Sequence, residues 1–297
     1  MNSYDVVQAY STDPIIPLLC GYRRFAAYEH GTLREIPFED TARGRICSFA
    51  YREAPIVFVT NTDVLPSVRR LGIESARVVR LPHAVDSARL FRFAAEHRHV
   101  RAVGGGDVVF YSPSRQDWVD PDPSFAKGND RFVRALALIR GAGVSFRAVL
   151  TDWGRDAAAT RDLVADLSLD DVVEWIEPLR KRLLWQQYLS AHAVVDQFIT
   201  PAMGGVTFEA LALGCRVVTA LDMETARDFF GAPPPLFSAS DTEEIAAALE
   251  SVARDPLDVA ERGPAARRWF EQYHSADRVV DLETRAYERI LAAHGHA

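Results

Sequence analysis

Two glycines and a glutamate stand close together in the segment QFITPAMGGVTFEALALGC. Gly204 and Gly205 open a predicted helix at residues 206–213, which follows a predicted strand at residues 193–198. Glycines at a helix N-terminus let an anion approach free backbone N–H groups, and the helix dipole favours negative charge there. Glu209 comes about one turn later, within reach of a diol on a group attached to that anion. Amides that can bind a phosphate, next to a carboxylate that can bind a ribose, predict a nucleotide site. The alternative is that Glu209 is an ordinary solvent-facing glutamate.

Two cations follow another predicted strand, at residues 107–111. Arg115 comes soon after this strand, and Lys127-Gly128 directly precedes a predicted helix at residues 130–140. Open α/β sheets bind ligands at the carboxyl ends of their strands. The planar fork of arginine and the point charge of lysine both suit a pyrophosphate. Because the chain holds 34 lysines and arginines, ordinary surface residues are the alternative, and the pair is informative only beside the glycine helix.

Strand-like runs alternate with helical patterns along most of the chain, which indicates parallel sheets with crossover helices and an α/β fold. A first series of predicted strands covers residues 5–9, 25–28, 56–60 and 78–81. A second series covers 107–111, 146–151, 172–176, 193–198 and 216–220. Predicted helices cover 130–140, 157–167, 180–191, 206–213, 243–254 and 276–293. Residues 87–107 are predicted as a linker, and the triplet Gly104-Gly105-Gly106 in it precedes a strand and therefore indicates a turn.

Composition excludes several classes of protein. The net charge of −7 gives no basic field for nucleic acid. The three cysteines form no CxxC pair, which favours a reducing, cytoplasmic location over a disulfide framework or a zinc site. No apolar run approaches the roughly 20 residues of a membrane helix, and the first residues do not resemble a secretory signal.

Together, the glycine helix and the two cations resemble the donor-binding signature of the retaining, GT-B-fold glycosyltransferases of family 4 (group 1 glycosyltransferases). In that family an arginine and a Lys-Gly after the first strand of the C-terminal domain bind the donor pyrophosphate, as Arg115 and Lys127 would here. The family's glycine-containing loop and Glu–seven residues–Glu motif bind phosphate, sugar and ribose. The residues that match this part are Gly204, Gly205, Val206, Thr207 and Glu209. The resemblance implies no cofactor.

Residues 173–179 match the family's loop against the nucleobase, so Leu179 is an expected donor contact. One position departs from the pattern: Pro201 stands eight residues before Glu209, where the family has the glutamate that touches the transferred sugar. Asp196 and Gln197 could reach the sugar, but an ordinary role at a strand end is the favoured interpretation.

The segment AAYEHGTLREIPF resembles a strand of the family's N-terminal domain that ends in a histidine near sugar and acceptor, which would be His30; a structural histidine is the alternative. The run LPHAVDSARLF resembles the hinge between the two domains, so its residues are expected to be architectural.

The resemblance implies a GT-B-like architecture of two Rossmann-like domains with parallel sheets. We expect a partial, acceptor-side N-terminal domain at residues 1–86 and a nucleotide-sugar-binding domain at 87–275. A C-terminal helix at 276–297 is expected to pack back toward the first domain. Family members have further elements before the first strand seen here, so we expect an incomplete N-terminal sheet that a partner chain or self-association completes. We also expect the chain by itself to be a poor catalyst.

The expected function is transfer of a sugar from a nucleotide diphosphate sugar to an acceptor of unknown kind, with retention of configuration. His30, Arg115, Lys127 and Glu209 are the expected catalytic residues. A non-catalytic donor-binding or scaffold subunit and a nucleotide-sugar epimerase are the alternatives. Asp120-Pro121-Asp122 spells an Asp-x-Asp metal motif, but proline-flanked aspartates are usual in turns, and no metal is expected. The tryptophans at 153, 175, 185 and 269 lack interleaved basic residues and fit buried or half-buried faces better than a base-stacking platform.

Overall fold

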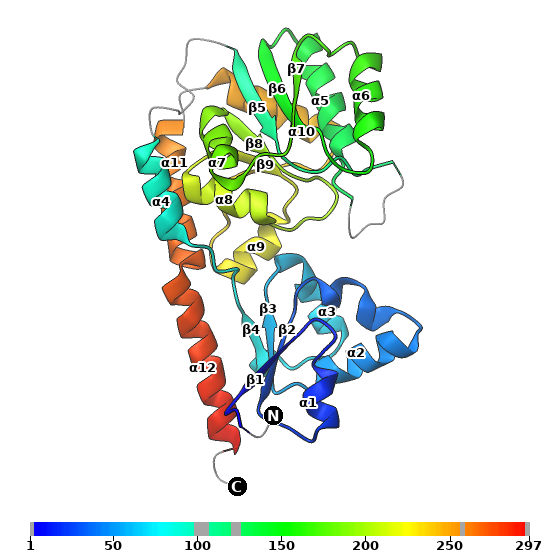
Figure 1. The fold of residues 1–297 in the computed structure, drawn as a ribbon, viewed down its shortest axis with the longest axis vertical. Helices are drawn as coiled ribbons and strands as arrows, with labels where there is room; N and C mark the ends of the chain where they lie inside the picture. Colours follow the sequence, from blue (N-terminus) through cyan, green and yellow to red (C-terminus); the bar gives the residue numbers. More distant parts are fainter. Residues whose placement is uncertain (1–2, 98–106, 120–125, 256–258, 295–297) are drawn as a thin grey trace. The chain divides into compact units, whose positions relative to one another are not determined.

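The computed structural model describes residues 3–97, 107–119, 126–255 and 259–294, and its two sheets are parallel throughout (Figure 1). The predicted α/β class is therefore confirmed. The chain divides into two compact units. The first comprises Met1–Val85, Asp228–Phe230 and Tyr273–Ala297, and the second comprises Asp86–Arg227 and Gly231–Gln272.

The first unit is built on a four-stranded sheet in the order β1-β2-β3-β4. Its strands are short and rich in apolar residues: β1 Val7–Tyr10, β2 Phe25–Tyr28, β3 Ile56–Val59 and β4 Val78–Arg80. Ala26 pairs with Ile56 and Val57 with Val78, and all four residues of β3 are buried. Burial on both faces explains why β3 is a continuous apolar run instead of an alternating one.

Helices cover both sides of this sheet. α1 Ile15–Leu19, α2 Ala42–Glu53 and α3 Leu65–Arg70 connect the strands, and Thr41 caps α2 by accepting from the Gly44 amide at 3.0 Å. α12 Ala276–His294, drawn in red in Figure 1, runs along the sheet. Its apolar side chains form a core cluster with the strands, whose buried members are Ala26, Ile56, Phe58, Leu81, Val279, Ala286 and Ile290.

The second unit has a six-stranded sheet in the order β10-β9-β8-β5-β6-β7. Its strands are β5 Val108–Ser112, β6 Phe146–Thr151, β7 Val173–Ile176, β8 Ala193–Val195, β9 Val217–Thr219 and β10 Phe237–Ser238. The helices are α4 Ser87–Glu96, α5 Asn129–Gly141, α6 Ala157–Asp166, α7 Lys181–Ser190, α8 Gly205–Leu213, α9 Met223–Phe230, α10 Thr242–Arg254 and α11 Val259–His274. The last three residues of α9 and the last two of α11 belong to the first unit.

The two faces of this sheet are covered by different helices. Phe110 belongs to the core cluster formed with α5, α6 and α10. The next residue, Tyr111, points the other way, and its ring lies 5.9 Å from that of Tyr188 on α7. Successive strand residues face opposite sides, so a three-layer arrangement needs apolar residues at consecutive positions.

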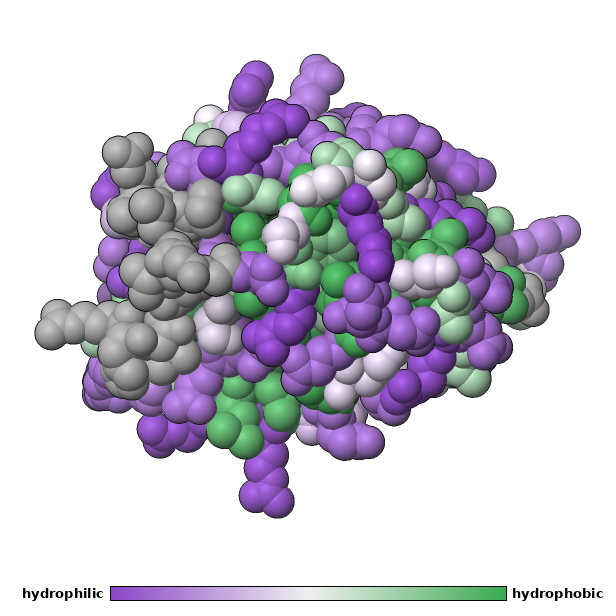
Figure 2. All heavy atoms as spheres, turned by 90° about the horizontal axis from the view of Figure 1, so that it is seen from above, coloured by the Kyte–Doolittle hydropathy of each residue, from purple (hydrophilic) through white to green (hydrophobic). Residues whose placement is uncertain are grey.

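The face of the molecule in Figure 2 shows hydrophilic side chains around an apolar area at its centre.

Most predicted elements are confirmed with shifted ends, but the predicted linker is partly wrong. Residues 87–96 form α4, whereas the glycine triplet lies outside the described residues. Asp86 caps α4 by accepting from the Arg89 amide at 3.0 Å, and Leu90, Phe93 and Ala94 are buried. An N-cap aspartate followed by apolar residues at helical spacing was the signal for this helix. The sequence prediction also missed α1, α2 and α3 of the first unit, as well as α9, α11 and β10.

Cys20 is exposed, Cys47 and Cys215 are buried, and none of the three forms a disulfide in the described part of the chain. Among the described helices, none combines the length and the apolar character that crossing a bilayer requires.

Two histidines of the first unit lie close together, His274 fully buried and His83 half-buried. Nδ1 of His274 lies 3.0 Å from the carbonyl oxygen of His83. Burial lowers the pKa of His274 to about 3 and that of His83 to about 4, from an ordinary value of 6.5. Both rings are therefore neutral in the folded protein at pH 7.

We predict that the first unit loses stability as the pH falls below 6.5, because the unfolded chain binds protons that the folded chain rejects. Each ring should contribute a slope of about 1.4 kcal/mol per pH unit until the pH reaches its folded pKa. Urea unfolding of the His274→Gln variant between pH 7 and pH 5 should show a shallower dependence than the parent protein. Equal slopes would contradict the assignment.

Candidate functional site

The order of strands reverses between β5 and β8 in the second unit. From β5 the chain proceeds through β6 and β7 to one edge of the sheet, and then from β8 through β9 and β10 to the other. Crossover connections therefore leave the sheet in opposite directions at this point, which opens a crevice at the carboxyl ends of the two strands. The loop after β5 carries Arg115 and Lys127, and the loop after β8 leads to Gly204.

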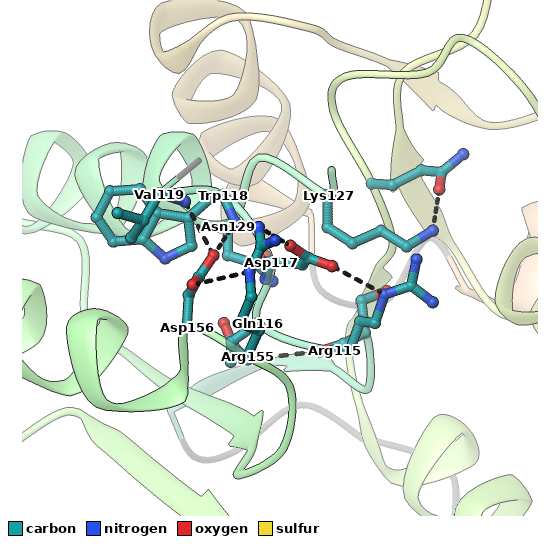
Figure 3. Close-up of polar contacts among 11 residues, drawn as sticks. Arg115, Gln116, Asp117, Trp118, Val119, Lys127, Asn129, Arg155 and Asp156 are labelled. Carbon is teal, nitrogen blue, oxygen red and sulfur yellow. Dashed lines mark hydrogen bonds and ion pairs between the residues drawn. The ribbon is translucent and has the colours of Figure 1, made fainter. Parts of the chain in front are cut away.

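The loop after β5 is anchored by Asp156, which is only 8% exposed (Figure 3). Its Oδ2 atom accepts hydrogen bonds from the Trp118 amide at 2.6 Å and the Val119 amide at 2.9 Å. Burial alone would raise the pKa of Asp156, but these two amides and the Arg155 guanidinium lower it below its ordinary value. The carboxylate is therefore charged at neutral pH and holds the loop against α6.

A second carboxylate, Asp117, holds the arginine of this loop. Oδ2 of Asp117 lies 3.4 Å from Nε of Arg115, and Oδ1 lies 2.7 Å from Nη2 of Arg155. The backbone carbonyl of Asp117 also accepts from the Lys127 amide at 2.8 Å. Figure 3 shows Arg115 and Lys127 pointing to the same side of the loop, away from Asp156. Contacts with Asp117 thus hold both predicted cations on the same side of the sheet.

Gln197 connects Lys127 to the loop that precedes α8. Its side-chain oxygen accepts a hydrogen bond from Nζ of Lys127. Its side-chain nitrogen donates to the carbonyls of Ala202 at 2.9 Å and Thr200 at 3.2 Å, and the residue is only 6% exposed. Sequence reasoning gave Gln197 an ordinary role at a strand end, whereas the structure shows it bridging two segments that each carry predicted site residues.

The N-terminus of α8 is formed as the sequence predicts. Gly204 is the N-cap residue and supplies no side-chain hydrogen bond, and a Cβ atom on Gly205 would meet open space. The first amides of the helix have no intrahelical acceptor and can bind an anion. Thr207 is fully buried, and its hydroxyl donates to Oδ2 of Asp196 at 2.8 Å. Only the backbone amide of Thr207 is thus left to take part in binding.

Glu209 lies on α8 with its side chain 15% exposed. Its Oε1 atom lies 2.6 Å from Nζ of Lys181, and its Oε2 atom accepts from Nε1 of Trp185 at 3.0 Å. Both partners belong to α7, and neither was predicted from the sequence. Since α7 and α8 are separated by β8, only their packing brings the three residues together.

A cavity of about 410 Å³ lies on the same side of the sheet, within the second unit. It brings together the predicted residues Leu179, Gly205, Val206 and Glu209. The rest of its lining consists of Tyr111, Pro113, Thr151, Trp153, Pro178, Lys181, Leu184 and Tyr188. Four predicted residues do not line this cavity: Arg115 and Lys127 lie on the loop after β5, Gly204 lies at the end of the loop after β8, and Thr207 lies in α8. A cavity with an acidic side chain, helix amides and nearby cations can hold a ligand that carries both hydroxyls and an anion.

His30 belongs to the first unit, where it is exposed at the carboxyl end of β2. Its ring lies 6.0 Å from that of His83 in an edge-on arrangement. The preceding Glu29 is fully buried, and its carboxylate accepts hydrogen bonds from the Gly31 amide and, at 3.2 Å, from the Thr60 hydroxyl. A catalytic role for His30 stays a prediction.

Asp120-Pro121-Asp122 lies outside the described residues. Within the parts of the chain that the structure describes, no group of three or more His, Cys, Asp or Glu side chains is arranged to hold a metal ion.

Comparison with solved structures assigns the fold to a class. The chain is similar to sucrose-phosphate synthase from Thermosynechococcus elongatus, with a TM-score of 0.72 and 18% identity over 98% of this chain and 75% of that one. It is also similar to HepE from Anabaena in complex with UDP-glucose, with a TM-score of 0.70 and 17% identity over 97% of this chain and 79% of that one. A glycosyltransferase from Rickettsia africae matches with a TM-score of 0.62 and 13% identity over 97% of this chain and 99% of that one. The chain therefore has the GT-B fold of glycosyltransferases.

Among curated proteins, the chain is similar to D-inositol 3-phosphate glycosyltransferase of Pseudarthrobacter chlorophenolicus. The two sequences are 27% identical over 221 residues, which is 72% of this chain and 50% of the relative. The chain thus spans about half the length of this curated relative. No protein-family model matches the sequence.

We predict that Asp156→Ala destabilises the second unit by about 2 kcal/mol, because it removes the buried, charged acceptor that the Trp118 and Val119 amides share. Asp152→Ala is the matched control, since the Asp152 side chain is 28% exposed and pairs with a half-exposed Arg161. That change should cost less than about 1 kcal/mol. Urea unfolding measures both values, and similar costs for the two variants would contradict the anchoring role of Asp156.

Proposed function

We propose that this chain binds a nucleotide diphosphate sugar in the second unit and transfers the sugar to an acceptor. The observation that carries this proposal is the cavity at the carboxyl ends of the strands, which Glu209 and the N-terminus of α8 line, beside the loop after β5 that carries Arg115 and Lys127. A nucleotide diphosphate sugar offers a ribose diol to the glutamate and a diphosphate to the amides and the cations. Structural similarity to HepE, whose solved complex holds UDP-glucose, supports the same class of donor.

The proposed catalytic contribution of the second unit is electrostatic. Negative charge builds up on the diphosphate as the bond to the sugar breaks. Arg115, Lys127 and the amides at Gly204 and Gly205 would stabilise that charge, and groups held in place beforehand need no reorganisation during the reaction. Asp117 and Gln197 hold the two cations in position, so we assign them as positioning residues.

Glu209 would accept hydrogen bonds from the ribose hydroxyls. Its carboxylate is already oriented by Lys181 and Trp185, and each carboxylate oxygen can accept more than one hydrogen bond. Leu179 and the amide of Val206 complete the proposed donor contacts in the cavity.

The finer parts of the proposal rest on the family resemblance. Transfer would occur with retention at the anomeric carbon, and His30 in the first unit would border the sugar or the acceptor. Residues 1–86 would form the acceptor side and 87–275 the donor side.

We predict that the chain binds UDP, GDP or ADP in the presence of a chelator, because Arg115, Lys127 and the α8 amides supply the positive charge that a metal ion would otherwise bring. Isothermal titration calorimetry measures this binding. Absence of heat with all three nucleotides, for a folded sample, would overturn the donor site. Product analysis with a panel of nucleotide sugars and acceptors then tests transfer, and NMR of the product tests retention.

Two variants should separate the ribose contact from the diphosphate contacts. Glu209→Gln should weaken nucleoside diphosphate binding about tenfold or more, because a hydrogen bond to a charged group contributes about 1.5–3 kcal/mol. It should leave the binding of inorganic pyrophosphate unchanged. Lys127→Ala should weaken both ligands, since its charge faces the phosphates in either case.

Glu174→Gln serves as the control for Glu209→Gln, because Glu174 forms an exposed ion pair with Arg147 on β6 and does not line the cavity. It should leave both affinities unchanged. Equal loss of pyrophosphate and nucleotide binding in Glu209→Gln would show that this residue does not contact ribose.

A further inference from the structure

Trp153 is an exposed aromatic residue on the wall of the candidate donor cavity. It lies two residues after the end of β6, it is 44% exposed, and it lines the cavity together with Pro178 and Leu179. The neighbouring aromatic residues of the same cavity wall are buried: Tyr111 and Tyr188 are both 0% exposed. An indole ring that stays partly in solvent although it lines a cavity leaves apolar surface for a ligand to cover.

The ring of Trp153 is held in position by contacts with the loop that carries Arg115. Nε1 of Trp153 donates to the Pro113 carbonyl at 3.1 Å, and the Trp153 carbonyl accepts from the Gln116 amide at 2.8 Å. The next residue, Gly154, has φ +112°, and a Cβ atom there would lie 2.4 Å from the carbonyl oxygen of Gln116. Close packing of these two backbones fixes the direction of the indole before any ligand arrives, so little entropy is lost on binding.

The position of the ring relative to the other proposed contacts selects the part of the donor that it meets. The diphosphate is assigned to the α8 amides, Arg115 and Lys127, and the ribose to Glu209. What remains of a nucleoside diphosphate is its planar base, and the part of the cavity lining that is not assigned to phosphate or ribose includes Trp153, Thr151, Pro178 and Leu179. A flat heteroaromatic ring stacks on an indole without needing a particular hydrogen-bond pattern.

We propose that Trp153 is a binding residue that stacks on the nucleobase of the donor, and that it contributes affinity for nucleotides of any base over ligands that lack one. The proposal rests on the donor site assigned above. It also implies that Gly154 and Gln116 act as positioning residues for the indole, because they fix the turn that presents it.

Intrinsic fluorescence and calorimetry together test this assignment. UDP, GDP and ADP should quench the tryptophan fluorescence of the parent protein, whereas inorganic pyrophosphate should not. Trp153→Leu should weaken binding of the three nucleotides about tenfold, since stacking on a base contributes about 1–3 kcal/mol. Its affinity for pyrophosphate should equal that of the parent.

Trp153→Phe keeps an aromatic face but loses the hydrogen bond to Pro113, so it should retain most of the affinity for nucleotides and lose most of the quenching. Trp175→Phe is the matched control. Trp175 lies on β7 under the guanidinium of Arg161 and packs against the core cluster, outside the cavity. Its replacement should leave both affinity and quenching as in the parent protein.

Three results would overturn the inference. Parental nucleotide affinity in Trp153→Leu would show that the ring does not stack on the base. Parallel loss of nucleotide and pyrophosphate binding would show that Trp153 acts only by holding the Arg115 loop. Undiminished quenching in Trp153→Phe would assign the signal to another tryptophan. In all three cases the parent still binds nucleotides, whereas failure of the proposed function would appear as a parent that binds none.

Discussion

The candidate site depends on the reversal of strand order between β5 and β8. In a parallel sheet the carboxyl ends of all strands lie on the same side, and successive crossover connections normally proceed in one direction along the sheet. Where the direction changes, neighbouring strand ends lose their cover and backbone amides and loop side chains become accessible. Arg115 and Lys127 leave the sheet on one side of this point, and Gly204 on the other. Distant parts of the chain therefore converge without any local sequence signal for their proximity.

Buried polar side chains keep these loops in place. Asp156, Asp117 and Gln197 each have little exposed surface, and each makes two or more hydrogen bonds or ion pairs to backbone or cationic groups. Loop backbone cannot satisfy its own hydrogen bonds as strands and helices do, so a fixed loop needs such partners. Because a buried acceptor that loses its partner is costly, the satisfied network favours one loop conformation over alternatives.

Glu209 shows how charge is balanced inside the cavity. A carboxylate next to a site for a diphosphate would repel it, but Lys181 neutralises one oxygen and Trp185 binds the other. The same two contacts fix the direction in which the remaining lone pairs point. A ligand with a diol can use those lone pairs while the diphosphate binds elsewhere, at the helix amides and the two cations. Separation of the two functions along one helix follows from the length of the first turn of α8.

The sequence alone determined the α/β class, most strands, several of the longer helices and the glycine-opened helix α8, but it left open whether Glu209 faces a binding site or solvent. These features depend on short-range patterns: apolar runs, helical periodicity and glycines at a helix start. The linker prediction missed α4, because a His/Arg-rich segment and a glycine triplet outweighed the helical signal of Asp86 and the apolar residues after it. Nor could the sequence show that Lys181 and Trp185 hold Glu209, that Gln197 bridges Lys127 to the α8 loop, or that Trp153 lines the same cavity. Such contacts join segments far apart in the chain, and only strand order and helix packing bring them together.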